Sequence, residues 1–242
     1  MTVAERPLAL GAWTHTLNFE DVLSMALQAR PGMRETQWRE QAAAASRFAV
    51  ASQRSSQLRI ASTIVRPYHG LIPDDSFLAD LQDASRARTR DLIYGRYLAA
   101  KPLARAVARA LVARFTRGTT FSLAELEETL DPLVATIAAS SRKRTRTAIV
   151  SEFTRAGILE GTVRTGLRLT DRSVDGLAFA HLLLDDLTQR SEAPDRWIVH
   201  ESTPVVVFAL GELRARTALE DAIAAGRLRR SYLNGEPRVL AP

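Results

Sequence analysis

The segment 118–172 restricts the fold more than any other part of the chain, because it carries a complete helix-start signal. Ser122 and Glu125 have the spacing of a capping box, in which each side chain bonds to the other residue's backbone N–H. Phe121 and Leu126 have the spacing of the hydrophobic staple that accompanies such a start. A helix is therefore expected to begin at Ser122.

The residues that follow predict two more helices and a hairpin. A short helix is expected after Pro132, and a longer one from about Ser140 to Ala156, where Gly157 has the position of a left-handed helix end. Two short runs, 158–161 and 166–170, are separated by a polar turn and predict a β-hairpin. Three helices followed by a hairpin is the element order of a winged helix-turn-helix.

Helical periodicity also runs through the first half of the chain. Leu103, Val107, Leu111 and Phe115 repeat every four residues after Pro102, which predicts a helix with one apolar stripe. Further helices are expected over 18–28, 34–46 and 53–65. Another is expected to start at Asp74 or Asp75 and to run through Leu81, either continuing or breaking near Ser85, as far as about Ala99.

The expected fold class is mostly α. An N-terminal, arginine-rich helical bundle over 1–117 is followed by a winged-helix-like α+β region with short β-hairpins over 118–242. The winged-helix-like module covers 118–172, and a small α+β tail covers 173–242. In the tail, Asn234-Gly235 predicts the turn of a closing hairpin. A helix or an apolar segment is expected in the tail over 203–210, and a helix over 213–225.

The charges lie in alternating blocks. The chain carries 33 Lys and Arg against 27 Asp and Glu, a net charge of +6. Residues 82–117 hold nine cations and two acids, and residues 140–172 hold eight cations and three acids. Residues 118–139 hold acids alone, and residues 173–201 have a net charge of −4. Either the blocks are solvated helix faces that pair with one another, or the two basic blocks form a footprint for a polyanion.

The predicted helix 140–156 has two faces when it is drawn at about 100° per residue. Ile149, Phe153 and Ala156 fall together and are expected to face the core. The other side carries Arg144, Thr147, Ser151 and Arg155, and the first turns also carry Arg142, Lys143 and Arg146. A helix that reads DNA requires such cations and hydroxyls toward its N-terminal end. The expected DNA-binding residues, including those of the hairpin and of the helix that starts at Pro102, are Arg105, Arg109, Arg142, Lys143, Arg144, Arg146, Thr147, Ser151, Arg155, Arg164 and Arg168.

No arrangement of side chains indicates catalysis or a cofactor. The chain has no cysteine, which excludes thiolate nucleophiles, Cys-based zinc sites and iron–sulfur clusters. Its four histidines lack metal-ligand spacing, and no glycine pattern matches a nucleotide-binding loop. Asp74 after Pro73 resembles the start of a PD-(D/E)xK nuclease signature, but the lysine of that signature is missing. We therefore expect a protein that is not an enzyme and that has no metal or other cofactor.

The apolar segments indicate where the protein resides. The apolar run from Pro204 to Leu210 is far shorter than the roughly 18 residues that suggest a membrane span. The N-terminus lacks the basic region and long apolar region of a signal peptide. We expect a cytoplasmic protein without a membrane partner.

The order of these segments resembles the BrxA-like proteins of bacterial BREX phage-exclusion systems. Residues 94–161 carry the resemblance best, with YLAAKPLARAVARALVARF, FSLAEL and SSRKRTRTAIVSEFTRAGILEG in succession. The resemblance implies a non-enzymatic protein that binds double-stranded DNA. It also implies other BREX components as partners, in a defence complex with a methyltransferase, an ATPase and a phosphatase-like protein. The role of the first 33 residues stays open.

Other functions remain open from the sequence. A stand-alone winged-helix transcription regulator would be a dimer on a palindromic site, and an assembly adaptor would turn its charged blocks toward protein partners. Residues 142–146 could also dock onto the acidic segment 175–186 of the same chain instead of onto DNA. Salt-dependent binding to duplex DNA separates the adaptor from the other two functions, because phosphate contacts release counterions.

Overall fold

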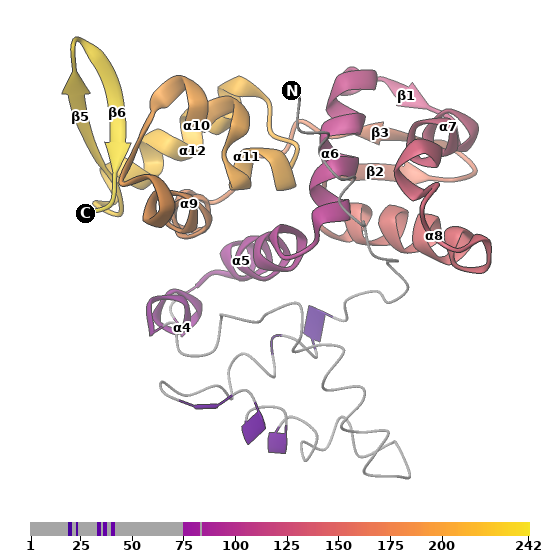
Figure 1. The fold of residues 1–242 in the computed structure, drawn as a ribbon, viewed down its shortest axis with the longest axis horizontal. Coiled ribbons are helices and arrows are strands. Elements are labelled where there is room, and N and C mark those ends of the chain that lie inside the picture. The colour runs from indigo at the N-terminus through magenta and orange to yellow at the C-terminus, as the bar shows by residue number, and fades with distance from the viewer. Residues whose placement is uncertain are drawn as a thin grey trace, which may run out of the picture. The chain divides into compact units, whose positions relative to one another are not determined.

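A computed structural model describes residues 19, 20, 23, 33, 34, 36, 37, 40, 41, 75–82 and 84–242. These residues form two compact units (Figure 1). The inserted unit is made by residues 102–170, and the flanking unit is made by the described residues of 17–101 together with 171–242. The helices expected over 18–28, 34–46 and 53–65 lie outside the described residues, apart from isolated positions.

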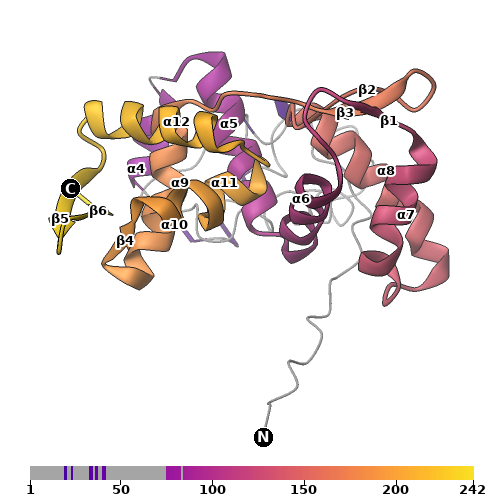
Figure 2. The same cartoon turned by 90° about the horizontal axis from the view of Figure 1, so that it is seen from above.

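The inserted unit combines helices with a three-stranded antiparallel sheet, which Figure 2 shows from above. In the sheet β3 lies in the middle and pairs with β1 on one side and with β2 on the other. The long helix followed by a hairpin is confirmed, but two helices precede the hairpin within 122–156 where three were expected, and β1 adds a strand that the sequence did not predict. The elements are α6 (Pro102–Arg114), β1 (Thr120–Phe121), α7 (Leu123–Val134), α8 (Ala139–Arg155), β2 (Leu159–Thr162) and β3 (Gly166–Leu169).

Helix α7 begins as predicted but ends later. Ser122 Oγ accepts a hydrogen bond from the Glu125 N–H at 3.2 Å, and Glu125 Oε2 accepts one from the Ser122 N–H at 2.7 Å. The separate helix expected after Pro132 is wrong, because α7 continues through Pro132 to Val134. Pro132 lacks an N–H to donate to the preceding turn, and the loss of that one bond near the helix end leaves α7 continuous.

The core of the inserted unit contains the apolar residues that the periodicities predict. Leu103, Val107 and Leu111 of α6 are buried, and so are Ile149 and Phe153 of α8. The rings of Phe115 and Phe121 stack with their centroids 3.8 Å apart, which closes the core between the end of α6 and the sheet.

The flanking unit is built around α9, which packs against both α5 and α12. Gly95 permits the close approach of α5 to α9, because a Cβ atom at this position would lie 2.5 Å from Cδ1 of Leu182. Its elements are α4 (Asp75–Gln82), α5 (Arg86–Ala99), α9 (Gly176–Arg190), β4 (Glu192–Pro194), α10 (Asp195–Glu201), α11 (Thr203–Val207), α12 (Glu212–Ala224), β5 (Arg229–Leu233) and β6 (Glu236–Leu240).

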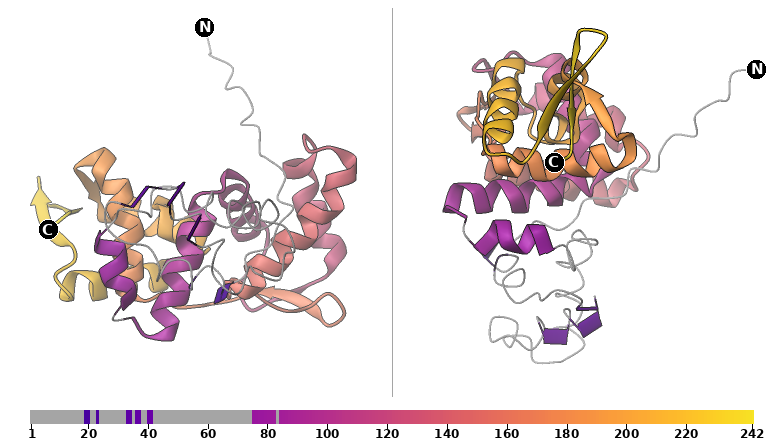
Figure 3. Two further views of the ribbon diagram at one scale, coloured as in Figure 1. Left: turned by 90° about the horizontal axis from the view of Figure 1, so that it is seen from below. Right: turned by 90° about the vertical axis from the view of Figure 1, so that its left-hand side faces the viewer.

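A second antiparallel sheet, in the order β4-β6-β5, closes the flanking unit. Asn234 and Gly235 have φ angles of 54° and 79°, which are the left-handed values that the predicted Asn-Gly turn requires. The β5–β6 hairpin extends away from the helices of its unit (Figures 1 and 3). The described part of the chain is thus mostly α with short β-hairpins, as expected. None of its helices is long and apolar enough to cross a membrane.

Candidate nucleic-acid interface

All of the DNA-binding residues expected from the sequence lie in the inserted unit. They come from α6, from α8 and from the β2–β3 hairpin. Helix α8 supplies most of them, and it buries one side against the unit: Thr145, Ala148, Ile149, Glu152 and Phe153 are buried. The structure therefore brings the predicted residues together in one folded unit, and it sorts them by what each side chain contacts.

Two arginines of α8 bond to the unit itself. Arg142 donates from Nε to the carbonyl of Ile137 at 2.9 Å and from Nη2 to the carbonyl of Ala135 at 2.7 Å. Arg146 forms an ion pair with Asp131 of α7, and its side chain is only 27% exposed. These two guanidinium groups therefore contact the end of α7 and the turn after it.

Lys143 and Arg144 lie between these two residues in the sequence but have a different environment. Both are exposed. Neither side chain forms an ion pair or a hydrogen bond with another described residue. One turn later, Thr147 is exposed and its hydroxyl donates to the carbonyl of Lys143 at 3.0 Å. The outward side of α8 thus presents two uncompensated charges and a hydroxyl near the positive end of the helix dipole.

The C-terminal half of α8 offers less charge. Ser151 is half-buried. Arg155 is exposed and lies 3.5 Å from the buried carboxylate of Glu152. Because Glu152 offsets part of its charge, Arg155 is a weaker candidate for a phosphate contact than Lys143 or Arg144.

The β2–β3 hairpin carries one free cation at its turn. Thr162 and Thr165 bond across the turn, with their hydroxyl oxygens 2.9 Å apart. Between them, Val163 is 52% exposed and Arg164 is exposed, without a recorded partner among the described residues. Arg168, further along β3, pairs with Glu160 of β2 at 2.5 Å. Among the described residues, nothing neutralises Arg164, so it is the cation of this hairpin that can meet an anion.

Helix α6 contributes the other two expected residues. Arg105 and Arg109 are exposed, on the side of the helix opposite the buried stripe. Each of them already has an interaction partner. They add to the positive charge of the inserted unit, whereas Lys143, Arg144 and Arg164 are the cations of 102–170 whose charge no described residue shares.

The basic block 82–117 divides between the two units. Two of its α5 arginines pair with acids of α9 or of its N-cap: Arg88 contacts Asp175 at 3.0 Å, and Arg96 contacts Asp185 at 3.1 Å. The charge pattern allowed two interpretations, a footprint for a polyanion or basic and acidic blocks that pair with each other. For Arg88 and Arg96, the second interpretation is correct. Their guanidinium groups hold α5 against α9.

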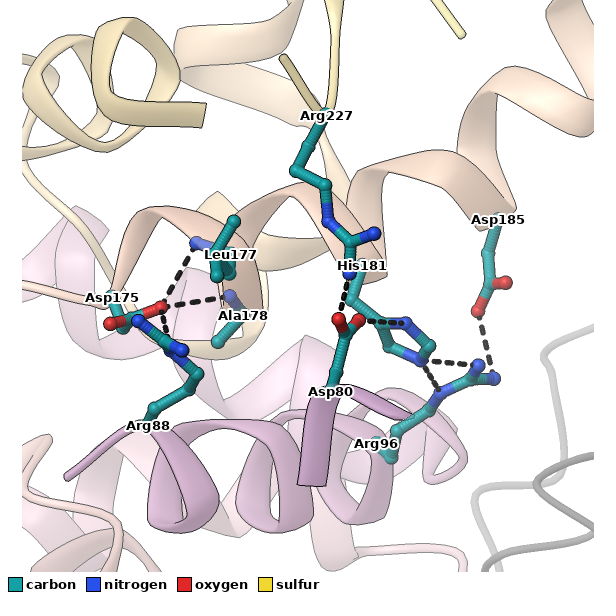
Figure 4. Close-up of polar contacts among 9 residues, drawn as sticks. All are labelled: Asp80, Arg88, Arg96, Asp175, Leu177, Ala178, His181, Asp185 and Arg227. Carbon is teal, nitrogen blue, oxygen red and sulfur yellow. Dashed lines mark hydrogen bonds and ion pairs between the residues drawn. The ribbon is translucent and has the colours of Figure 1, made fainter. Parts of the chain in front are cut away.

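A buried polar cluster in the flanking unit was not predicted. His181 is 3% exposed, and its Nε2 accepts from Arg96 Nε at 2.9 Å (Figure 4). Its Nδ1 lies 3.6 Å from Asp80, which also pairs with Arg227. An imidazole that accepts at Nε2 carries its proton at Nδ1, toward the Asp80 carboxylate. In the sequence, His181 is only a histidine within an apolar helical segment. The side chains that contact it lie far away in the chain, so the cluster could not be predicted.

The same unit contains a second buried ion pair. Asp91 of α5 accepts from Arg172 and, at 3.0 Å, from the N–H of Asp175. The Arg172 guanidinium also lies 4.6 Å from the centre of the Phe208 ring. Burial lowers the pKa of Arg172, and the charge of Asp91 opposes that shift. This pair fixes the chain where it returns from the inserted unit.

The described residues offer no group of three or more His, Cys, Asp or Glu side chains that could hold a metal ion. The Asp80–His181 pair is enclosed by Arg96 and Arg227 and by the ring of Phe77, whose centroid lies 5.1 Å from that of His181. Two guanidinium groups beside these side chains repel a cation. The cluster therefore has the character of a packed polar network.

Comparisons with known proteins bear on the fold. No protein-family model matches the chain, and no curated protein is significantly similar to it. Two solved structures are similar, one described as the SspB crystal structure and the other as the magnesium ion-bound SspB crystal structure. The match to the first has a TM-score of 0.59 and 14% sequence identity, and it covers 94% of this chain and 81% of that one. The second has a TM-score of 0.58 with the same identity and coverage. At this identity, the chain is similar to SspB in fold alone.

Proposed function

We propose that this chain binds double-stranded DNA through its inserted unit, which would act as a winged helix. Helix α8 would be the recognition helix and the β2–β3 hairpin would be the wing. The observation that carries the proposal is the set of three exposed and uncompensated cations, Lys143, Arg144 and Arg164, on these two elements. Their charges are available to phosphate because no described residue neutralises them.

Phosphate contacts would dominate the binding energy. Each phosphate that a cation neutralises contributes about −0.9 to the slope of log K against log salt concentration. Three contacts therefore predict a slope of about −3, and contributions from Arg105, Arg109 or Arg155 would make it steeper. The Ser151 hydroxyl could donate to phosphate or to a base edge, whereas the Thr147 hydroxyl would first have to release the carbonyl of Lys143, because it carries one proton. Hydroxyls do not distinguish one base from another strongly.

The test is the affinity for a labelled random-sequence duplex between about 50 and 200 mM salt. We expect binding that weakens with salt along the predicted slope. Arg229→Ala provides a matched control, because Arg229 is an exposed cation of the flanking unit without a recorded partner in the described chain. This control should leave the slope unchanged. A flat salt response, or no binding at about 50 mM salt, would remove the proposal.

We further propose that the protein is a non-catalytic accessory of a BREX-type phage-defence system. The resemblance of residues 94–161 to BrxA-like proteins supports this role. The purified protein should neither cut DNA in magnesium or manganese nor hydrolyse ATP. Host cells that carry the defence genes should lose protection against phage, measured as plaque counts, when this chain is deleted. Protection that is unchanged by the deletion would refute the defence role without affecting DNA binding.

One observation favours a second candidate function, as an assembly adaptor. Tyr232 and Leu233 at the end of β5 are 71% and 48% exposed. A large aromatic and an aliphatic side chain on an extended hairpin are typical of protein-contact residues. If the flanking unit binds a protein, Tyr232→Ser with Leu233→Ser should reduce co-purification of that protein while DNA affinity stays unchanged.

A further inference from the structure

The four cations near the start of α8 divide into two pairs. At about 100° per residue, Arg142 and Arg146 lie about 40° apart on one flank of the helix. Arg144 lies about 160° from both, and Lys143 lies about 100° from Arg142 and about 60° from Arg146. The flank of Arg142 and Arg146 faces the end of α7, as their contacts with Ala135, Ile137 and Asp131 show. The sequence assigned all four residues to DNA, whereas their surroundings differ.

Arg142 satisfies backbone groups that the helices leave unpaired. Ala135 is the C-cap of α7, and the last carbonyls of a helix have no intrahelical donor. Helix α8 follows immediately, and Ala138 at its N-cap provides no side-chain hydrogen bond. The guanidinium of Arg142 thus joins the first turn of α8 to the turn that leaves α7. A cation at this position also complements the negative end of the α7 dipole.

Arg146 fixes the next turn of α8. Its partner Asp131 belongs to the last turn of α7, so the ion pair and the two carbonyl bonds of Arg142 lie along one line of contact between the helices. The charge of Arg146 is already compensated, and a phosphate would have to compete with a carboxylate for it. These contacts set the orientation of α8 on α7, and therefore the direction in which Lys143 and Arg144 point.

From this arrangement we infer that Arg142 and Arg146 are positioning residues for the recognition helix, and that Lys143 and Arg144 make the phosphate contacts of α8. The inference rests on the proposed function and refines it. It gives different roles to two pairs of cations that look alike in the sequence: one pair sets where the helix lies, and the other pair sets how the affinity depends on salt.

The salt slope separates the two roles. Lys143→Ala with Arg144→Ala should lower the magnitude of the slope by about 2, because two phosphate contacts are lost. At about 0.1 M salt the affinity should fall roughly eightfold for each contact. The melting temperature should hardly change, because both side chains are exposed. Arg142→Ala with Arg146→Ala should lower the melting temperature and the affinity while the slope changes by less than about 0.5.

A charge exchange tests Arg146 without relying on a destabilised variant. Arg146→Asp alone places two carboxylates together and should weaken both folding and binding. Adding Asp131→Arg restores an ion pair in the opposite sense, so the melting temperature and the affinity should return toward those of the unmodified protein. If Arg146 contacts phosphate, the exchange would restore the melting temperature and leave the affinity as low as in Arg146→Asp.

The outcomes also separate this inference from the proposed function. If the unmodified protein fails to bind duplex DNA, the proposed function is wrong. If it binds but Lys143→Ala with Arg144→Ala leaves the slope unchanged, the division of roles is wrong and the proposed function survives. A slope that falls equally in both double variants would overturn the inference as well, because all four residues would then be phosphate contacts.

Discussion

Removing the carboxylate of Asp91 is expected to destabilise the flanking unit strongly. Asp91 and Arg172 join segments that are 81 residues apart, and their side chains are only 8% and 14% exposed. In Asp91→Ala the Arg172 guanidinium keeps its charge in a buried site, and the N–H of Asp175 loses its acceptor. Breaking a buried ion pair from one side costs about 3–5 kcal/mol.

This loss is large enough to measure by thermal unfolding. In a chain of this length, about 1 kcal/mol shifts the melting temperature by about 2–4 °C, so a loss of about 4 kcal/mol corresponds to about 8–16 °C. Asp171→Ala is a matched control, since Asp171 and its partner Arg214 are 55% and 39% exposed. An exposed pair contributes no more than about 1 kcal/mol.

A second variant separates the buried charge from the loss of packing. Asp91→Leu with Arg172→Met removes both charges and keeps apolar volume, so it should recover much of the lost stability. Circular dichroism melts of the variants test the expectation. If Asp91→Ala costs no more than Asp171→Ala, the pair does not hold the flanking unit together and the argument fails.

Three further changes test other parts of the fold. Ser122→Ala removes the N-cap of α7 and should cost about 1 kcal/mol in a denaturant titration; a loss near zero would contradict the capping box. The backbone and side chain of Ser122 hold the pKa of Glu125 below its usual value, so this stabilisation is present at neutral pH and disappears as the pH falls through that lowered pKa. Gly161 has a φ of +96°, and in Gly161→Ala the new Cβ atom would lie 2.2 Å from the carbonyl oxygen of Gly166. The substitution should therefore destabilise the inserted unit by more than about 1 kcal/mol and reduce its DNA affinity. His181→Leu removes the hydrogen-bond acceptor of Arg96 and should lower the free energy of unfolding by about 1–3 kcal/mol, measured by thermal melting. An unchanged melting temperature would show that Arg96 needs no acceptor there.

The sequence predicted the features that depend on neighbouring residues. The capping box of Ser122 and the Asn234-Gly235 turn each follow from side chains within a few positions of one another. The apolar stripe of α6 follows from the repeat of the helix. The sequence alone therefore places these elements to within one or two residues, without any tertiary contact.

Features that depend on distant residues were missed. Strand β4 is three residues long and exists because it pairs with β6, more than forty residues later. Arg142 and Arg146 resemble exposed cations in the sequence, but their partners Ile137, Ala135 and Asp131 come together only when α7 and α8 fold against each other. A helical projection places a residue on a face without indicating what that face contacts.

The arrangement of the two units also predicts the order in which the protein folds during its synthesis. The described residues of the inserted unit form one continuous stretch, 102–170, so their core can form as soon as Leu169 has left the ribosome. Helix α5 is made earlier but buries its apolar side against α9, and the contact between Arg96 and His181 spans 85 positions. At about 5–20 residues per second, α5 waits about 4–17 s for its partner. During that interval the buried residues of α5 are the part of the nascent chain that a chaperone would bind.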